Sequence, residues 1–245
     1  MTQIKFYGDP VPGFTEEVLP GKLIVLEGTD GVGRSTQIAL LQEWLEGRGF
    51  AVASTGLRRS DLASKGIDRA KQGHTLSEGV LFLLYVTDLA DRLETQIIPA
   101  LRAGMVVLTD RYIYSMIVRS QVRGSDPQWI RKTLGFALVP DAVFYLQADL
   151  NHLIPRVLAE QGGFDYWESG MDFLKGRDLF RNYVRYQTRL LAQFDAIAEE
   201  FGFRRIDANR SIREIFSELR REVSAIVTPM KRQASVEVKP KEPSA

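Results

Sequence analysis

The sequence predicts an α/β fold of three layers, in which a five-stranded parallel sheet carries helices on both faces. Short apolar runs alternate along the chain with helical patterns, which is typical of parallel strands joined by helices. Four of the runs are nearly continuous rather than alternating, as strands buried on both faces should be. The 245 residues are 44% hydrophobic and 26% charged, which fits a globular protein with a sizeable core.

The strands are expected where the apolar runs occur. The clear runs are "LIVLE" (23–27), "AVAST" (51–55), "MVVLT" (105–109) and "AVFYL" (142–146). A fifth, "FRRID" (203–207), is weaker. Because ligands of such sheets bind at the carboxyl ends of the strands, we look for functional residues directly after these runs.

Helical patterns fill the segments between the strands. The segment 35–49 carries apolar residues on one face and stops at a glycine. That face consists of Ile38, Leu41 and Leu45. A long apolar-rich helix is expected over 76–104, with a bend near Pro99.

The chain is expected to form one domain between two flanking segments. Residues 1–20 contain three prolines and two glycines and predict an irregular lead-in. The domain should occupy residues 21–227. From Thr228 the apolar periodicity disappears, so residues 228–245 are interpreted as a mobile tail.

Charge and composition restrict the partners. A formal net charge of +1 gives no electrostatic case for nucleic acid or for a membrane surface. No apolar run reaches the ~18 residues that a membrane span needs, and the first residues do not resemble a signal peptide. The absence of cysteine excludes disulfides and thiolate chemistry. We therefore expect a cytoplasmic protein without nucleic-acid or membrane partners.

A glycine-rich loop follows the first strand. "GTDGVGRST" (28–36) matches the phosphate-binding pattern G-x-x-x-x-G-K-[ST], except that Arg34 stands in the lysine position. Glycines let successive N–H groups point at phosphate oxygens, and the next helix begins with its positive end toward them. The expected ATP-binding residues of the loop are Gly28, Thr29, Asp30, Gly31, Val32, Gly33, Arg34, Ser35 and Thr36.

Arg34 leaves three interpretations open. Its guanidinium carries the same charge as lysine and binds phosphate well, often through two parallel hydrogen bonds. It is also bulkier, so the loop could bind nucleotide without turnover. The third interpretation is a chance glycine turn between a strand and a helix.

A second motif, "DRYIYS", follows the strand at 105–109. An acidic residue at the end of a neighbouring strand is where phosphate-loop proteins place a magnesium-orienting carboxylate, so Asp110 and Ser35 are candidate Mg²⁺ ligands. Arg111 would point into the same cleft. The alternative is a helix-capping aspartate beside a surface arginine.

These segments resemble the thymidylate kinase family of nucleoside monophosphate kinases. "LEGTDGVGRSTQ" is similar to the family's strand and loop, "DRYIYS" to its D-R-Y-x-x-S signature, and "RIDANRSIREIFSELR" to its closing strand and last helix. The similarity spans roughly Lys22 to Ile226. It implies a P-loop kinase fold, commonly dimeric, that transfers the γ-phosphoryl group of ATP to thymidine monophosphate with Mg²⁺.

The resemblance also implies roles for single residues. Asp30 would contact the sugar hydroxyl of the acceptor, and Arg111 would hold the acceptor phosphate. Asn209 lies in the turn expected near adenine. The implied catalytic residues are Arg34, Asp110 and Arg111.

The chain departs from the family pattern in the acceptor site. In place of an arginine-proline segment it has "TGLRRSDLAS", from which Arg58 or Arg59 could supply a second cation for the acceptor phosphate. Tyr85 matches the aromatic residue that stacks on thymine, although an aromatic at helical spacing is often simply core. The base-reading arginine four positions later is Leu89, and the family's A-Y-Q is the "VRS" of 118–120.

The lid pattern is also changed, because no arginine lies between Val157 and Met171. An arginine at the transferring phosphoryl group can be worth about 10³–10⁵ in rate. Arg34 is the candidate replacement. The sequence therefore leaves two alternatives beside thymidylate phosphorylation: a kinase of another phosphorylated acceptor, and an inactive nucleotide-binding regulatory module.

Overall fold

The computed structural model describes residues 2–3, 5–14, 18–73 and 76–237. Its main sheet has five parallel strands in the order β4-β5-β3-β6-β7. The strands are β3 (Lys22–Glu27), β4 (Val52–Gly56), β5 (Val106–Asp110), β6 (Ala142–Gln147) and β7 (Arg204–Asp207). Each lies within one residue of its predicted bounds, so the strand prediction is confirmed, including the weaker fifth run.

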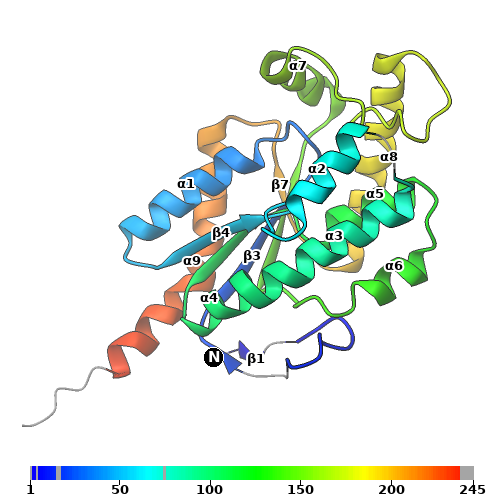
Figure 1. The fold of residues 1–245 in the computed structure, drawn as a ribbon. Helices are drawn as coiled ribbons and strands as arrows, with labels where there is room; N and C mark the ends of the chain where they lie inside the picture. Colours follow the sequence, from blue (N-terminus) through cyan, green and yellow to red (C-terminus); the bar gives the residue numbers. More distant parts are fainter. Residues whose placement is uncertain (1, 4, 15–17, 74–75, 238–245) are drawn as a thin grey trace, which may run out of the picture.

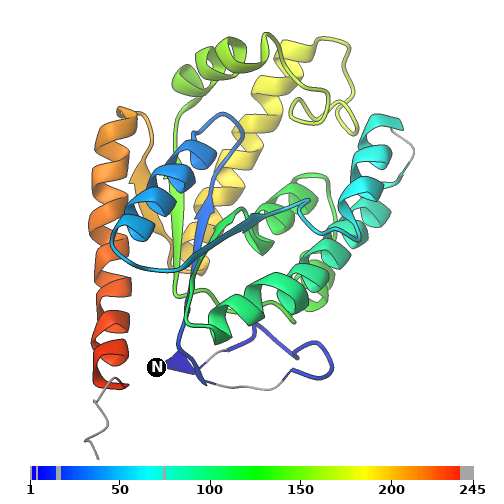
Figure 2. The ribbon, with the colours of Figure 1, turned by 60° about the vertical axis from the view of Figure 1, so that its left-hand side comes forward.

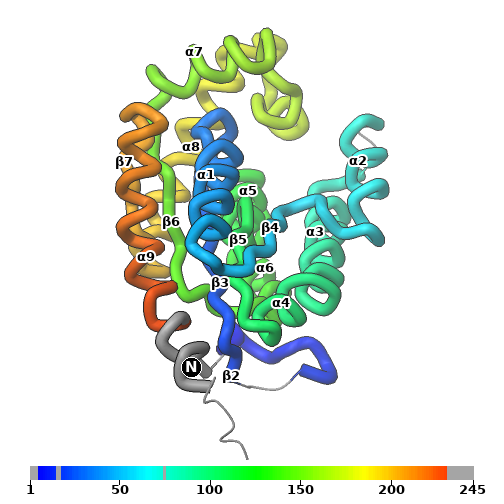
Figure 3. The backbone as a smooth tube through the Cα atoms, turned by 90° about the vertical axis from the view of Figure 1, so that its left-hand side faces the viewer, coloured from blue at the N-terminus to red at the C-terminus, as the bar shows by residue number. Residues whose placement is uncertain are grey.

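Helices cover both faces of this sheet (Figure 1). On one face lie α1 (Arg34–Gly47) and α9 (Ile212–Glu237). On the other lie α3 (Glu78–Arg92), α5 (Ile113–Val122) and α8 (Leu179–Glu200). The tube in Figure 3 shows the sheet between these two helical layers. The three-layer prediction is confirmed.

The two layers have separate cores because successive side chains of a strand point to opposite faces. In β3, Leu23 and Val25 pack into the core under α3, α5 and α8, whereas Ile24 and Leu26 pack under α1 and α9. All four are 2% exposed or less. Burial of each such side chain contributes about 1.5–3 kcal/mol. The predicted apolar face of α1 is confirmed, since Ile38, Leu41 and Leu45 are buried in the second core.

The expected long helix over 76–104 is divided into three pieces. α3 is followed by one turn of π-helix (η1, Leu93–Ile97) and then by α4 (Ile98–Arg102). Pro99 lies in the first turn of α4, where its missing N–H is tolerated. Where the sequence predicted a bend near Pro99, the structure has a π turn that ends two residues before this proline.

Three shorter helices complete the described fold: α2 (Ser64–Gly73), α6 (Pro127–Thr133) and α7 (Leu150–Gln161). None of the helices in the described ranges is long and apolar enough to cross a membrane. In Figure 2, α2 stands opposite the segment between α7 and α8, across the carboxyl ends of the strands.

Strand register brings the functional loops together. Leu26 of β3 and Gly56 of β4 both pair with Asp110 at the end of β5. The glycine loop, the "DRY" segment and the Arg58–Arg59 segment therefore leave the sheet side by side. This is the edge of the sheet where α/β proteins bind ligands.

Two short strands pair within the segment that was predicted to be an irregular lead-in. β1 (Thr2–Gln3) is antiparallel to β2 (Val18–Leu19). Tyr7 also anchors the segment, because its hydroxyl lies 2.5 Å from that of Tyr114. Aromatic packing thus ties part of this proline-rich segment to the domain, while residues 1, 4 and 15–17 lie outside the described structure.

The segment interpreted as a mobile tail from Thr228 begins as helix, because α9 continues to Glu237. The Thr228 hydroxyl donates to the carbonyl of Ser224, and Met230 packs against the core under α1 and α9. Helix continues here without an apolar period because Met, Lys, Arg, Gln and Ala, which follow Pro229, are good helix formers. Residues 238–245 of the expected tail lie outside the described structure.

Candidate active site

The glycine loop has the backbone that phosphate binding requires. Gly28 and Gly33 adopt φ angles of 147° and 91°, which side chains disfavour. A Cβ on Gly28 would lie 2.7 Å from the carbonyl oxygen of Leu146, so no other residue fits there. α1 begins directly after Gly33. The loop thus ends at a helix N-terminus, where backbone N–H groups and the helix dipole favour an anion.

Arg34 lies inside the loop and is only 8% exposed. Its Nε donates to Asp110 Oδ1 at 2.7 Å, and its Nη1 donates to the carbonyl oxygens of Gly28 (2.7 Å) and Thr29. We expected this side chain to face ligand; instead it is turned toward the loop carbonyls. A fork-shaped donor can bind several oxygens at once. Arg34 thus stabilises the loop through its carbonyl oxygens, whereas the sequence predicted that it binds phosphate.

Ser35 and Asp110 come together as the sequence predicted. The Ser35 hydroxyl donates to Asp110 Oδ2 at 3.1 Å. Burial would raise the pKa of Asp110, but the charges of Arg34 and Arg111 hold it below its usual range, so the carboxylate stays ionised. A hydroxyl next to an ionised carboxylate fits Mg²⁺, which prefers oxygen ligands and keeps several positions for water and phosphate. The described residues contain no group of three or more His, Cys, Asp and Glu that would form a complete metal site.

The "DRY" segment is held in an unusual conformation. Arg111 has a φ of 69°, a region that non-glycine residues rarely adopt, and its N–H donates to the carbonyl of Leu26 at 3.0 Å. Its guanidinium binds Asp30 and the Ser115 hydroxyl. The capping alternative is wrong, because α5 begins after Tyr112 and Arg111 is only 8% exposed.

Glu27 fixes this segment and was missed in the sequence. It is fully buried, and its carboxylate accepts hydrogen bonds from the Tyr112 N–H (2.8 Å), the Ser115 N–H (3.2 Å) and the Ser115 hydroxyl (2.6 Å). Burial raises the pKa of Glu27, and these donors oppose the rise. The signal was available as a lone acid at the end of an apolar strand, directly before Gly28.

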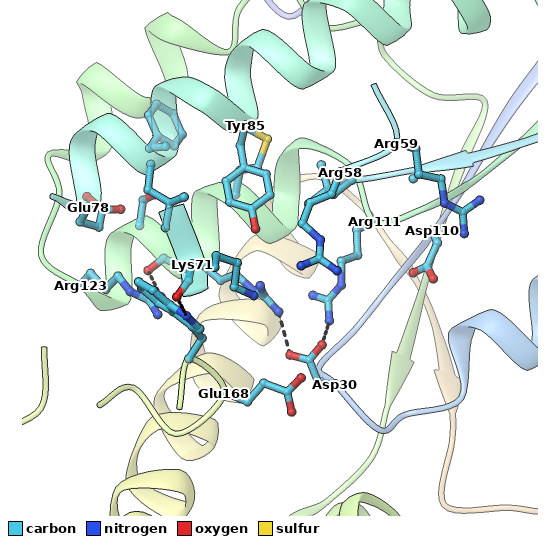
Figure 4. Close-up of a pocket in the computed structure, with 18 residues that line it drawn as sticks. Asp30, Arg58, Arg59, Lys71, Glu78, Tyr85, Asp110, Arg111, Arg123 and Glu168 are labelled. Carbon is cyan, nitrogen blue, oxygen red and sulfur yellow. Dashed lines mark hydrogen bonds and ion pairs between the residues drawn. The ribbon is translucent and has the colours of Figure 1, made fainter. Parts of the chain in front are cut away.

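A cavity of about 380 Å³ opens beside the loop, between α3 and α5 (Figure 4). The predicted acceptor residues Asp30, Arg58, Arg59, Tyr85 and Arg111 all line it. Asn209 does not line this cavity; its Oδ1 accepts from the Asp149 N–H at 3.1 Å, beside α7. Its proximity to adenine stays a prediction.

The structure shows where the residues that match or depart from the family's base-binding pattern lie relative to the cavity. Tyr85 faces the cavity and also packs against the core, whereas Leu89 is fully buried in the core and does not line the cavity. From α5 and the residue that caps its C-terminus, the side chains that line the cavity are Met116, Arg119, Ser120 and Arg123. Their spacing is that of one helix face. This periodicity could have identified Arg119 and Arg123, which the sequence analysis passed over.

A buried ion pair positions the Arg58–Arg59 segment. Asp88 accepts hydrogen bonds from the backbone N–H groups of Arg58 (3.1 Å) and Ser60 (2.9 Å). Arg92 Nε donates to the same carboxylate at 2.9 Å, and both side chains of the pair are fully buried. The i, i+4 spacing of an acid and a base in an apolar helix was the sequence signal for this pair.

The segment between α7 and α8 reaches across the cavity. Trp167 Nε1 donates to the carbonyl of Lys71 on α2 at 3.0 Å, and the Gln187 side chain donates to the carbonyl of Glu168 at 2.8 Å. Trp167, Glu168 and Lys71 all line the cavity. This segment therefore forms a wall of the predicted acceptor site, which the sequence analysis did not foresee.

Two of these residues titrate near neutral pH. Burial and the negative charge of Asp30 raise the pKa of Glu168 to about 7. Burial and the positive charges of Arg119 and Arg58 lower the pKa of Lys71 to about 8. The charge of the cavity thus changes as the pH rises through about 7 and then through about 8.

We expect Glu168→Gln to change the pH dependence of stability. Unfolded glutamate ionises near its ordinary pKa, whereas folded Glu168 keeps its proton to about pH 7, so its stabilising protonation is lost as the pH rises from about 4.5 through 7. Relative to the variant, the parent should lose about 1–3 kcal/mol of unfolding free energy between pH 5 and pH 8. Urea denaturation at both pH values measures this. Parallel changes in the two proteins would contradict it.

Comparison with known proteins agrees with this geometry. The family model for thymidylate kinase matches residues 26–219. A probable thymidylate kinase 2 of Saccharolobus solfataricus is 34% identical over 202 residues, covering 82% of this chain and 94% of the relative. A thymidylate kinase of Clavibacter michiganensis is 35% identical over 216 residues, covering 85% and 97%. A probable thymidylate kinase of Thermococcus gammatolerans is 30% identical, covering 81% and 94%.

The matched region includes the glycine loop from Gly28, the "DRY" segment and the turn at Asn209. It therefore contains every element that forms the phosphate loop and the cavity wall described above. The chain belongs to the thymidylate kinase family.

Proposed function

We propose that this protein transfers the γ-phosphoryl group of ATP to thymidine monophosphate, giving thymidine diphosphate and ADP. The observation that carries the proposal is the junction of two sites at Asp30. The phosphate loop that contains Asp30 contacts Arg111 on the wall of a cavity that is large enough for a small ligand. A donor and an acceptor phosphate could therefore meet next to Asp110.

The residues of this chain have separate tasks in that reaction. The loop N–H groups would bind the donor phosphates, joined by Arg34 when it leaves the carbonyls of Gly28 and Thr29. Arg111 with Arg58 or Arg59 would bind the acceptor phosphate. Ser35 and Asp110 would hold Mg²⁺, which supplies charge neutralisation across the donor phosphates. Catalysis of this kind consists mainly of positioning and electrostatic stabilisation, for which a rigid loop is the main requirement.

Arg34 is the cation best placed to compensate for the arginine-poor lid. It is the only cation in the loop sequence, and its guanidinium would reach a phosphate by turning from the Gly28 carbonyl and Asp110, which it binds in this structure. Guanidinium groups bind phosphate oxygens in the same forked manner. We infer further that the enzyme works in the cytoplasm. We also infer that it is a homodimer, and the molar mass from light scattering of the purified protein tests this.

The test is a coupled assay with ATP, Mg²⁺ and each common nucleoside monophosphate. We expect turnover with thymidine monophosphate. Tight ATP binding without product from any acceptor would indicate a regulatory module instead, and turnover with a different acceptor alone would also overturn the proposal.

The same assay tests base selectivity. Because Leu89 is buried in the core, it offers no hydrogen bond to a base. A lost charged hydrogen bond corresponds to about a ten- to hundredfold loss of selectivity. We therefore expect deoxyuridine and deoxycytidine monophosphates to compete measurably. A preference for thymidine well above a thousandfold would show that another residue reads the base.

A further inference from the structure

Arg119 is a second guanidinium on the carboxylate of Asp30. Its Nη2 donates to Asp30 Oδ2 at 2.7 Å, while Arg111 binds Oδ1 (Figure 4 marks both contacts at Asp30). Asp30 comes from the loop after β3, and Arg119 from the second turn of α5. Two arginines, one directly after β5 and one in α5, thus bind the two oxygens of a single carboxylate.

The electrostatics keep this carboxylate ionised. Burial would raise the pKa of Asp30, but the charges of Arg111 and Arg119 hold it well below its usual range. Burial would lower the pKa of Arg119, but the combined attraction of Asp30, Tyr186, Tyr85 and Glu168 raises it. Each carboxylate oxygen has two lone pairs, so Asp30 can still accept a hydrogen bond from a ligand.

The two arginines face different parts of the cavity. Among the groups whose charges act on Arg111 are Arg34 and Asp110, at the phosphate end. Those acting on Arg119 are Asp30 of the loop, which also acts on Arg111, and Tyr186, Tyr85 and Glu168, which lie outside the loop. In the described part of the chain, Nε and Nη1 of Arg119 have no hydrogen-bond partner, whereas Arg123 on the same helix face is engaged by Asp172 and Tyr186.

We propose that Arg119 is a positioning residue that holds Asp30 against the sugar hydroxyl of the acceptor nucleotide, and thereby makes the enzyme selective for acceptors that carry this hydroxyl. The proposal rests on the proposed function, because it needs a nucleotide in this cavity. Arg111 would bind the acceptor phosphate. Without Arg119, the Asp30 carboxylate would be bound by Arg111 alone and would turn toward the phosphate end of the cavity.

The test compares Arg119→Met and Arg119→Lys with the parent on two acceptors, thymidine monophosphate and its 3′-deoxy analogue. With thymidine monophosphate we expect Arg119→Met to lower kcat/KM about 30-fold, mostly through KM. With the 3′-deoxy analogue, which has no hydroxyl for Asp30, the loss should be less than about threefold. Arg119→Lys should recover part of the loss, and KM for ATP should not change.

Arg189→Met, an exposed site on α8, is the matched control and should behave as the parent. Melting temperatures identify any variant that is merely unstable, and calorimetric binding of both acceptors gives a readout independent of turnover. Equal losses on both acceptors would assign Arg119 to the phosphate or the base and overturn the proposal, as would no loss on either. Failure of the parent itself to phosphorylate thymidine monophosphate would instead contradict the proposed function.

Discussion

Replacing Arg34 with alanine is expected to lower kcat by about a thousandfold or more, with a folded protein and a smaller change in KM for ATP. The guanidinium is the only side-chain cation of the phosphate loop, and it bonds Asp110 and the carbonyls of Gly28 and Thr29. An arginine at a transferring phosphoryl group is worth about 10³–10⁵ in rate. Steady-state kinetics on the variant and on the surface control Arg189→Ala measure the effect. Unchanged activity would show that this loop is not the donor-phosphate site.

Arg34→Lys distinguishes two roles of the same side chain. Lysine restores the charge but cannot bind two oxygens through a planar fork. If Arg34 also replaces the lid arginine, we expect the variant to lose about tenfold in kcat. A lysine variant as active as the parent would show that Arg34 only substitutes for the usual lysine.

Asp110→Asn is expected to lower activity about a hundredfold and to raise the Mg²⁺ concentration needed for half-maximal rate. Asparagine keeps the shape of the side chain, so the change removes mainly the charge that faces Arg34 Nε (2.7 Å) and the Ser35 hydroxyl (3.1 Å). Mg²⁺ titrations of the variant, the parent and the exposed control Asp9→Asn test this. An unchanged Mg²⁺ requirement would remove Asp110 from the metal site.

The sheet was predictable because its signals are local. The residues of a central strand such as β3 alternate between two cores, so most of the strand is apolar. The apolar run in the sequence therefore marks the position of the strand. The glycine loop and the "DRY" segment were predictable for the same reason, since consecutive residues carry both motifs. Strand register then placed them together at Leu26 and Asp110.

The supports of the site were not predictable, because their partners are distant in sequence. Glu27 binds the segment around Ser115, and Asp88 binds the backbone at Arg58 and Ser60. Nothing in a single sequence states that these segments meet. The orientation of Arg34 was missed for a related reason: its position in the motif indicated charge at the phosphates, whereas the nearest oxygens are those of its own loop and of Asp110.

The carboxylate of Asp30 has a consequence for how the two substrates influence each other. It lies 4.0 Å from Arg34 Nη2 on the donor side, and it binds Arg111 and Arg119 on the acceptor side. A nucleoside triphosphate that draws Arg34 away would change the electric field at Asp30, and with it the free energy of acceptor binding. Thermodynamic reciprocity requires the acceptor to alter the affinity for ATP by the same factor. Cooperation between substrates would then arise inside a single chain, from one shared negative charge.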